Sequence, residues 1–126
     1  MIDILNRIRG PFNLSTLALA AANSALTDVD YVEKCMNENT RLREWLSNSL
    51  SDLGVESDKS CANFILARFK GSEEARACYK FLSNEGLLVR KVANYNLPNC
   101  LRITIGDELA CKRVYESVRS FLESVK

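Results

Sequence analysis

The stretch "CLRITIGDE", residues 100–108, decides the fold that the sequence predicts, because it describes a strand that runs directly into a helix. Aliphatic residues occupy every second position of its strand part, and alternate residues of a strand point to opposite faces of a sheet. The side chain of Arg102 therefore points away from the apolar face that packs on the core. Asp107 stands where it can cap the helix that follows.

Two further segments predict strands upstream. One is "NFILARF", residues 63–69, which is apolar at most positions of both parities and suits a strand covered on both faces. The other is "LLVRKVA", residues 87–93, and the residues after it, "NYNLPN", are of the types that form a turn or short loop. An antiparallel hairpin centred on Asn96 places Arg90 directly opposite Arg102, on the face away from the core.

Helices are predicted before, between and after these strands. The first, residues 14–26, is rich in strong helix formers, with Asn13 or Ser15 available as its N-cap. Its apolar residues surround the helix axis, so it requires cover on every side and indicates a missing neighbour. A capping box at Asp30 and Glu33 opens a second, long helix.

Glycines mark the ends of the middle helices. Gly54 ends the long helix, and a third helix begins at Ser72 and ends before Gly86. With the last helix after residue 107, the order of elements is α-α-β-α-β-β-α. This order predicts an α+β fold of two layers, in which helices pack on a short, largely antiparallel sheet of three strands.

Composition and charge exclude several classes of function. The chain has 126 residues, of which 47% are hydrophobic and 26% charged, as is typical of one globular domain. The formal net charge of +1 argues against a nucleic-acid partner, which normally goes with a basic excess. The amino terminus has no uninterrupted apolar stretch, so we expect neither a signal peptide nor a membrane segment.

Histidine is absent, which removes the usual general base, the Ser-His and Cys-His nucleophile pairs and the commonest zinc ligand. We therefore expect no metal site. The five cysteines are odd in number and never form a C-x-x-C arrangement, which is typical of a reducing cytoplasm. Cys35, Cys78 and Cys111 lie on or near apolar helical stripes and are expected to be buried.

The two opposed arginines are the candidate binding residues. At a separation of roughly 5 Å and an effective dielectric constant near 20, their repulsion costs about 3 kcal/mol before salt screening. A phosphate or carboxylate between them offsets that cost, because charge-assisted hydrogen bonds contribute about 1.5–3 kcal/mol each. The hypothesis is that Arg90 and Arg102 form an anion clamp. The alternative is that one or both point into water or pair with a surface glutamate.

Four segments carry a resemblance to a known family. These are "IRGPFNLSTLALAAANSAL", "NFILARF", "GLLVR" and "CLRITIG", in this order and at these separations. Together they resemble the C-terminal portion of histidinol-phosphate aminotransferase, a fold-type I enzyme dependent on pyridoxal phosphate. The resemblance implies that Arg102 binds the anionic end of the substrate and that Arg90 helps to bind the substrate phosphate.

The same resemblance implies that a cofactor domain precedes the matched region. Residues 1–13 are then a connector from that missing large domain, and residues 14–126 are the small C-terminal domain. No lysine here resembles the family's cofactor-binding stretch, and Lys59 and Lys70 are interpreted as surface charges. Gly10 stands where the family often has proline, and no role is assigned to the neighbouring arginine. The chain by itself is therefore expected to have no catalytic residue, bind no pyridoxal phosphate and not to transaminate.

For the parent protein, the resemblance implies amino transfer between histidinol phosphate and 2-oxoglutarate in histidine biosynthesis. The partners are then a phosphorylated amino alcohol, a 2-oxo acid, the large domain and a second subunit of a homodimer, in the cytoplasm. Two alternatives stay open. One is the small domain of a related pyridoxal phosphate enzyme, such as an aromatic aminotransferase or a threonine-phosphate decarboxylase. The other is a freestanding, non-enzymatic module that binds an anion or a protein.

Overall fold

A computed structural model describes residues 1–10 and 13–125 of the chain. The chain divides into two compact units, Met1–Cys35 and Met36–Lys126, each of which is considered by itself. No helix among the described residues is both long and apolar enough to cross a membrane.

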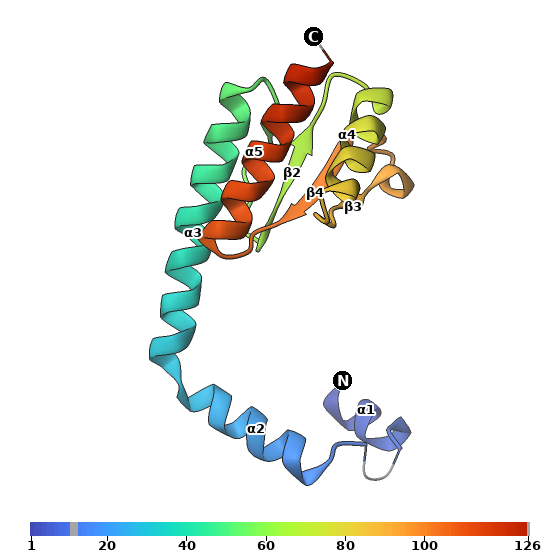
Figure 1. Ribbon diagram of the computed structural model, residues 1–126. Helices are drawn as coiled ribbons and strands as arrows, with labels where there is room; N and C mark the ends of the chain where they lie inside the picture. The colour runs from blue at the N-terminus through green and yellow to red at the C-terminus, as the bar shows by residue number, and fades with distance from the viewer. Residues whose placement is uncertain (11–12, 126) are drawn as a thin grey trace. The chain divides into compact units, whose positions relative to one another are not determined.

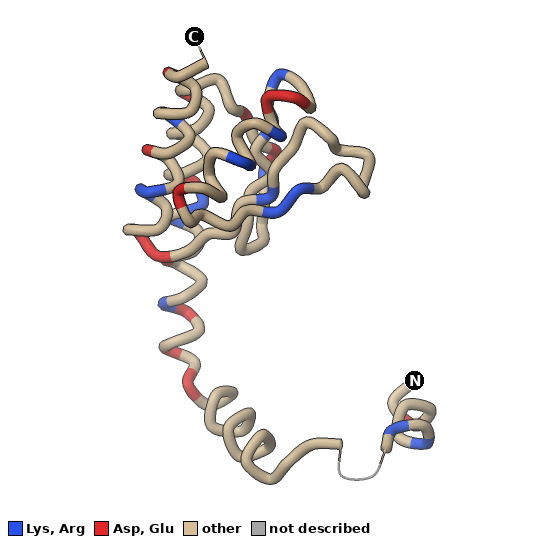
Figure 2. The backbone as a smooth tube through the Cα atoms, turned by 45° about the vertical axis from the view of Figure 1, so that its right-hand side comes forward, with Lys and Arg blue, Asp and Glu red and all other residues tan. Residues whose placement is uncertain are grey.

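The first unit contains helices without a core. Helix α1 spans Ile2–Ile8 and helix α2 spans Thr16–Thr27, and neither has a buried residue. The hydroxyl of Ser15 accepts a hydrogen bond from the N–H of Ala18 at 3.1 Å, which confirms Ser15 as the cap of α2. Figure 2 shows α2 as a helix without a charged residue.

Apolar side chains of this unit are exposed on all sides of the helices. Large hydrophobic residues that lie in the open are Met1, Ile2, Ile4, Leu5, Ile8, Leu14, Leu17, Leu19, Leu26, Val29, Tyr31 and Val32. Residues 14–26 are thus all exposed, and the missing neighbour that the sequence indicates stays a prediction. The predicted connector includes residues 11 and 12, which lie outside the described residues.

Helix α3, Val29–Asp52, begins earlier than the sequence predicts. The cap is Asp28, whose carboxylate accepts a hydrogen bond from the N–H of Tyr31 at 3.2 Å. The predicted capping box at Asp30 is therefore wrong, because an Asx residue two positions upstream already satisfies the first turn. Gly54 follows the end of α3 with φ of 83°, a left-handed conformation that glycine adopts without strain.

The sheet of the second unit has four strands in the order β1-β2-β4-β3, and every neighbouring pair is antiparallel. The strands are β1 (Glu56–Ser57), β2 (Phe64–Arg68), β3 (Arg90–Lys91) and β4 (Cys100–Thr104). The prediction of three strands is wrong by one, since β1 has only two residues and shows no periodicity. The strand predicted at residues 87–93 is also shorter than expected.

Two helices complete the unit, α4 (Ser72–Asn84) and α5 (Glu108–Ser124). Both starts agree with the prediction, and the carboxylate of Asp107 accepts a hydrogen bond from the N–H of Ala110 at 2.8 Å. Figure 1 shows α3, α4 and α5 grouped beside the sheet. The α+β class with helices layered on an antiparallel sheet is confirmed.

The core lies between these helices and one face of the sheet. Its buried residues include Leu42, Leu46, Leu50, Ile65, Ala67, Leu82, Leu101, Ile103, Val118 and Phe121. The prediction that alternate residues of β4 face the core is therefore confirmed. Cys78 and Cys111 are buried as expected, but Cys35 is exposed, because its turn of α3 belongs to the unit that has no buried residue.

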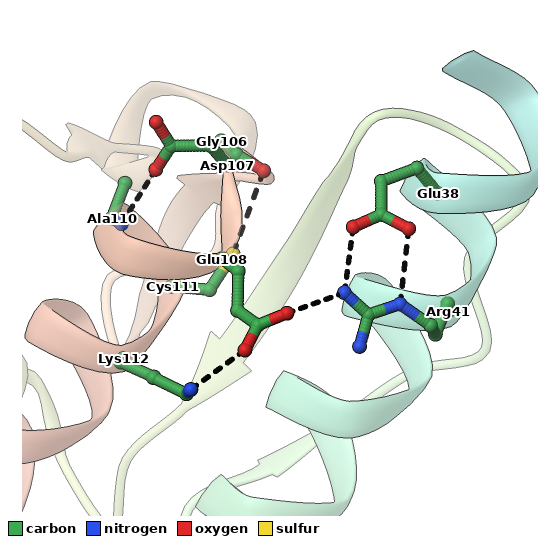
Figure 3. Close-up of polar contacts among 8 residues, drawn as sticks. All are labelled: Glu38, Arg41, Gly106, Asp107, Glu108, Ala110, Cys111 and Lys112. Carbon is green, nitrogen blue, oxygen red and sulfur yellow. Dashed lines mark hydrogen bonds and ion pairs between the residues drawn. The ribbon is translucent and has the colours of Figure 1, made fainter. Parts of the chain in front are cut away.

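Ion pairs fasten the start of α5 to α3, as Figure 3 shows. Arg41 donates to Glu38 at 2.6 Å and to Glu108 at 2.7 Å, and Lys112 donates to the other carboxylate oxygen of Glu108 at 2.6 Å. Hydrogen bonds from Lys112 and Arg41 lower the pKa of Glu108 from its ordinary value of 4.5 to about 2. This network fixes the helix that immediately follows β4.

Candidate functional site

Arg90 and Arg102, the arginine pair, lie directly opposite each other on β3 and β4. The next pair of the ladder joins Lys91 to Leu101, so the register is the one that the sequence predicts. Directly opposite Cβ atoms of antiparallel strands are about 5 Å apart. The backbone therefore brings the two candidate residues to neighbouring positions on one face of the sheet.

Local turn chemistry holds this register. A short 3-10 helix, Ala93–Tyr95, follows β3, and Asn96 then adopts a left-handed conformation with φ of 61°. Asparagine tolerates this region better than most residues, so the chain can reverse here at low cost. On its other side β4 is tied to β2, where the N–H of Phe69 donates to the carbonyl of Asn99 at 2.9 Å.

The pair belongs to the outer face of the sheet, which also includes Phe64, Leu66, Arg68, Cys100 and Thr104. On the opposite face, Ile65, Ala67, Leu101 and Ile103 are buried under the helices. The outer-face residues are half-buried or exposed, except Cys100, which is buried. The outer face is thus the side of the sheet from which a ligand can approach.

Arg102 rests on an aromatic ring. Its guanidinium carbon lies 4.3 Å from the centre of the Phe64 ring, within the range of a cation–π contact. The Phe64 ring contact was not predicted from the sequence. The sequence did place Phe64 in the predicted strand at residues 63–69, with the side-chain parity of the outer face. Its position beside β4 depends on the register between β2 and β4, which the sequence does not specify.

Arg90 is exposed and has a looser aromatic neighbour, Tyr95. One of its terminal nitrogens donates to the Tyr95 hydroxyl at 3.5 Å, and its guanidinium carbon lies 6.0 Å from the ring centre. Both distances are at the upper limit for their kind of contact. Arg90 therefore keeps most of its donors free for a ligand.

Neither member of the pair has a carboxylate within 4.0 Å among the residues that the structure describes. Arg68, on the same face, differs: it donates to Asp58 at 2.7 Å, and this hydrogen bond raises its pKa. Pairing with a surface glutamate is therefore not observed among these residues, whereas the exposed Arg90 fits the other half of the alternative, an arginine that points into water. The anion clamp stays a prediction.

Two hollows are lined by described residues of this unit. One, of about 560 Å³, is lined by residues that include Ser72, Arg76, Lys91, Pro98 and Leu101. Neither arginine of the pair lines this hollow or the second one, which lies between the end of α3 and the end of α5.

The described lysines differ from a lysine that forms a Schiff base with a carbonyl cofactor. A lysine that forms a Schiff base is normally desolvated, whereas the six described lysines are all exposed. Lys112 is also paired with Glu108, and the Lys91 ammonium lies 4.7 Å from the centre of the Tyr79 ring. Among residues 1–10 and 13–125, no cluster of three metal-ligating side chains occurs.

Comparisons with known proteins identify the family of the chain. The family described as "Aminotransferase class I and II" matches residues 1–118. A histidinol-phosphate aminotransferase of Ruegeria sp. (strain TM1040) is 58% identical over 121 residues, which cover 96% of this chain and 33% of that protein. The corresponding protein of Paracoccus denitrificans (strain Pd 1222) is 53% identical over 122 residues, which cover 97% of this chain and 33% of that protein. The chain thus spans about a third of the length of these curated relatives.

Solved structures show the same fold. A histidinol-phosphate aminotransferase from Sinorhizobium meliloti, solved in complex with pyridoxal-5'-phosphate, has a TM-score of 0.88 at 24% identity and matches 98% of this chain and 34% of its own. The enzyme of that name from Clostridium acetobutylicum has a TM-score of 0.86 at 22% identity, over 95% of this chain and 37% of its own. In each case the similar region is again about a third of the longer chain.

Proposed function

The chain belongs to the class I and II aminotransferase family, and on this premise we propose that it is the C-terminal, substrate-binding domain of a histidinol-phosphate aminotransferase. The observation that carries the proposal is the opposed, uncompensated arginine pair on the open face of the sheet. The names of the similar curated proteins support the choice of substrate. In the parent protein, amino transfer would run between histidinol phosphate and 2-oxoglutarate.

In this proposal the arginine pair positions the substrate. Arg102 and Arg90 hold the phosphate group of histidinol phosphate, and Arg102 holds a carboxylate of 2-oxoglutarate in the second half-reaction. A guanidinium matches phosphate and carboxylate geometry with paired N–H groups. Each charge-assisted hydrogen bond contributes about 1.5–3 kcal/mol. The substrate amine is thereby held at a defined distance from the group with which it reacts.

The reaction itself requires pyridoxal phosphate, which in this family serves as the electron sink. We propose that the cofactor is held by the large domain of the parent, and the exposure of all six described lysines supports this. That domain would also supply the second wall of the site and the cover for α2, whose residues are all exposed. We further propose a homodimeric, cytoplasmic parent, by extension from the family.

A chimaera tests this function. The matching 121 residues of the Ruegeria sp. (strain TM1040) protein are replaced by this chain, and amino transfer to 2-oxoglutarate is measured. The chimaera should use histidinol phosphate, and Arg102→Ala should raise its KM by about 10- to 100-fold. Arg113→Ala is the control for the loss of an arginine, because Arg113 lies on α5, away from the pair, and donates to the carbonyl of Glu85.

The alternatives give different results in the same system. An aromatic aminotransferase domain would favour phenylalanine over histidinol phosphate. An unchanged KM after Arg102→Ala would reject the assignment of the pair. A freestanding binding module would bind histidinol phosphate at micromolar strength as the 126-residue chain alone, which calorimetric titration would detect. One wall of a site should bind it far more weakly.

A further inference from the structure

Phe64 is a large aromatic residue that the core does not use. It lies half-buried on the outer face of the sheet, and it is neither in the buried cluster nor among the partly buried residues that pack against that cluster. Its partner in the ladder is Thr104, so Arg102 is its diagonal neighbour on β4. Diagonal neighbours are within reach of aromatic and long side chains.

The contact that Phe64 does make is with the functional arginine. The guanidinium carbon of Arg102 lies over the ring, 4.3 Å from its centre. Of the four cation–π contacts among the described residues, this one has the shortest distance to the ring centre. The Arg119 contact with Tyr115 on α5 is longer, at 5.7 Å.

A ring and a carboxylate hold an arginine in different ways. A carboxylate occupies N–H donors of the fork and offsets its charge, as Asp58 does for Arg68 through one hydrogen bond. A ring restrains the plane of the guanidinium through its face and leaves the N–H donors at the edge free. An anion site requires an arginine that is ordered but not neutralised.

We propose that Phe64 is a positioning residue for substrate binding: its ring holds the Arg102 guanidinium in the orientation that grips the anion while leaving its charge and its donors available. This inference rests on the proposed function, since it concerns the same anion site. It adds a residue on β2 to a site otherwise formed by β3 and β4. The role of Phe64 is indirect, through Arg102.

The test uses the isotope-labelled 126-residue chain and inorganic phosphate as the probe, at low ionic strength. The NMR signals of the arginine Nε–Hε groups report the position of the Arg102 guanidinium over the ring. Their change during titration gives the dissociation constant for phosphate. In the native chain, the ring current of Phe64 should displace the Arg102 signal. Phe64→Leu should abolish that displacement and weaken phosphate binding by about two- to fivefold. Phe64→Tyr, which restores the ring, should restore both.

Two controls separate positioning from general damage. Tyr115→Leu removes another arginine–aromatic contact and should leave phosphate binding unchanged. Backbone amide spectra of each variant report whether the sheet is intact, and the Phe64→Tyr chain provides a folded reference if the leucine variant is unstable.

Failure of the inference and failure of the proposed function look different. If Arg102→Gln weakens phosphate binding but Phe64→Leu does not, the ring has no positioning role and the arginine pair remains the anion site. If Phe64→Leu and Phe64→Tyr weaken binding equally, the ring face is again not what matters. If Arg102→Gln itself leaves binding unchanged, the arginine pair is not an anion site, and the proposed function and the inference both fall.

Discussion

Removing one arginine of the pair should stabilise the fold of the unliganded chain. Arg90 and Arg102 face each other across the ladder without a carboxylate partner among the described residues, so their repulsion is uncompensated when no anion is bound. Arg90→Gln and Arg102→Gln each relieve that repulsion. The double variant can relieve it only once, so its gain should be smaller than the sum of the two single gains.

The magnitude follows from Coulomb's law. With the charges taken at the Cβ spacing of about 5 Å, they repel by about 3 kcal/mol at a dielectric constant of 20 and by about 1 kcal/mol at 80. These are upper values, because the Arg102 guanidinium lies over Phe64 and that of Arg90 lies near Tyr95. Arg90 is exposed, so the lower value is the better guide, and we expect a coupling free energy of about 1 kcal/mol at 10 mM salt. At 1 M salt, where the screening length is about 3 Å, the coupling should fall to roughly a fifth of that value.

Urea unfolding measures this coupling in a double-mutant cycle. The single tryptophan, Trp45, packs against the core and stacks edge-on to Tyr115 at 5.9 Å, so its fluorescence reports unfolding of the second unit. Lys80→Gln, which removes an exposed positive charge from α4, provides the control for net charge. A coupling below about 0.3 kcal/mol at low salt, within the usual error of additivity, would refute the reasoning.

Three further predictions concern the second unit. Glu108→Gln should lower the free energy of unfolding above pH 4.5, and the difference from the native chain should vanish as the pH falls toward 2. The reason is that the folded state lowers the pKa of Glu108 to about 2. Urea midpoints between pH 2 and 6 measure this, and a difference independent of pH would contradict it. Leu46→Ala should cost about 3 kcal/mol of unfolding free energy, because Leu46 is fully buried in the core; a loss below about 1 kcal/mol would mean that the site collapses around the smaller side chain. Iodoacetamide should label the exposed Cys61 readily and Cys78 only after unfolding, because burial excludes the reagent and raises the pKa of Cys78 to about 12. Peptide mass spectrometry distinguishes the two cysteines. Equal labelling of both in the folded chain would contradict the burial of Cys78.

Features encoded within a few residues were predictable from the sequence. The Asp107 cap, the start of α4 at Ser72 and the glycine after α3 each depend on local hydrogen bonds and dihedral angles. The opposition of Arg90 and Arg102 was also predictable, because a short turn centred on Asn96 sets the register of the strands on either side of it.

Errors arose where a pattern was too short or a neighbour was distant. Strand β1 has two residues, too few to show the alternation that identifies a strand. Cys35 continues the apolar stripe of α3, yet periodicity cannot tell which part of a long helix meets a core. The pairing of Phe64 with β4 joins segments some forty residues apart, and only the folded sheet brings them together.

The sequence by itself determined the α+β class, the Asp107 cap and the opposition of two arginines, since these depend on side-chain period and local turn geometry. Only the tertiary structure decided that Asp58 pairs with Arg68, whereas the arginine pair has no carboxylate partner among the described residues. It also decided that a phenylalanine from β2 lies under Arg102. The physical reason is that a counter-ion or an aromatic support is selected by distance in space, and that distance depends on strand pairings which local sequence does not specify.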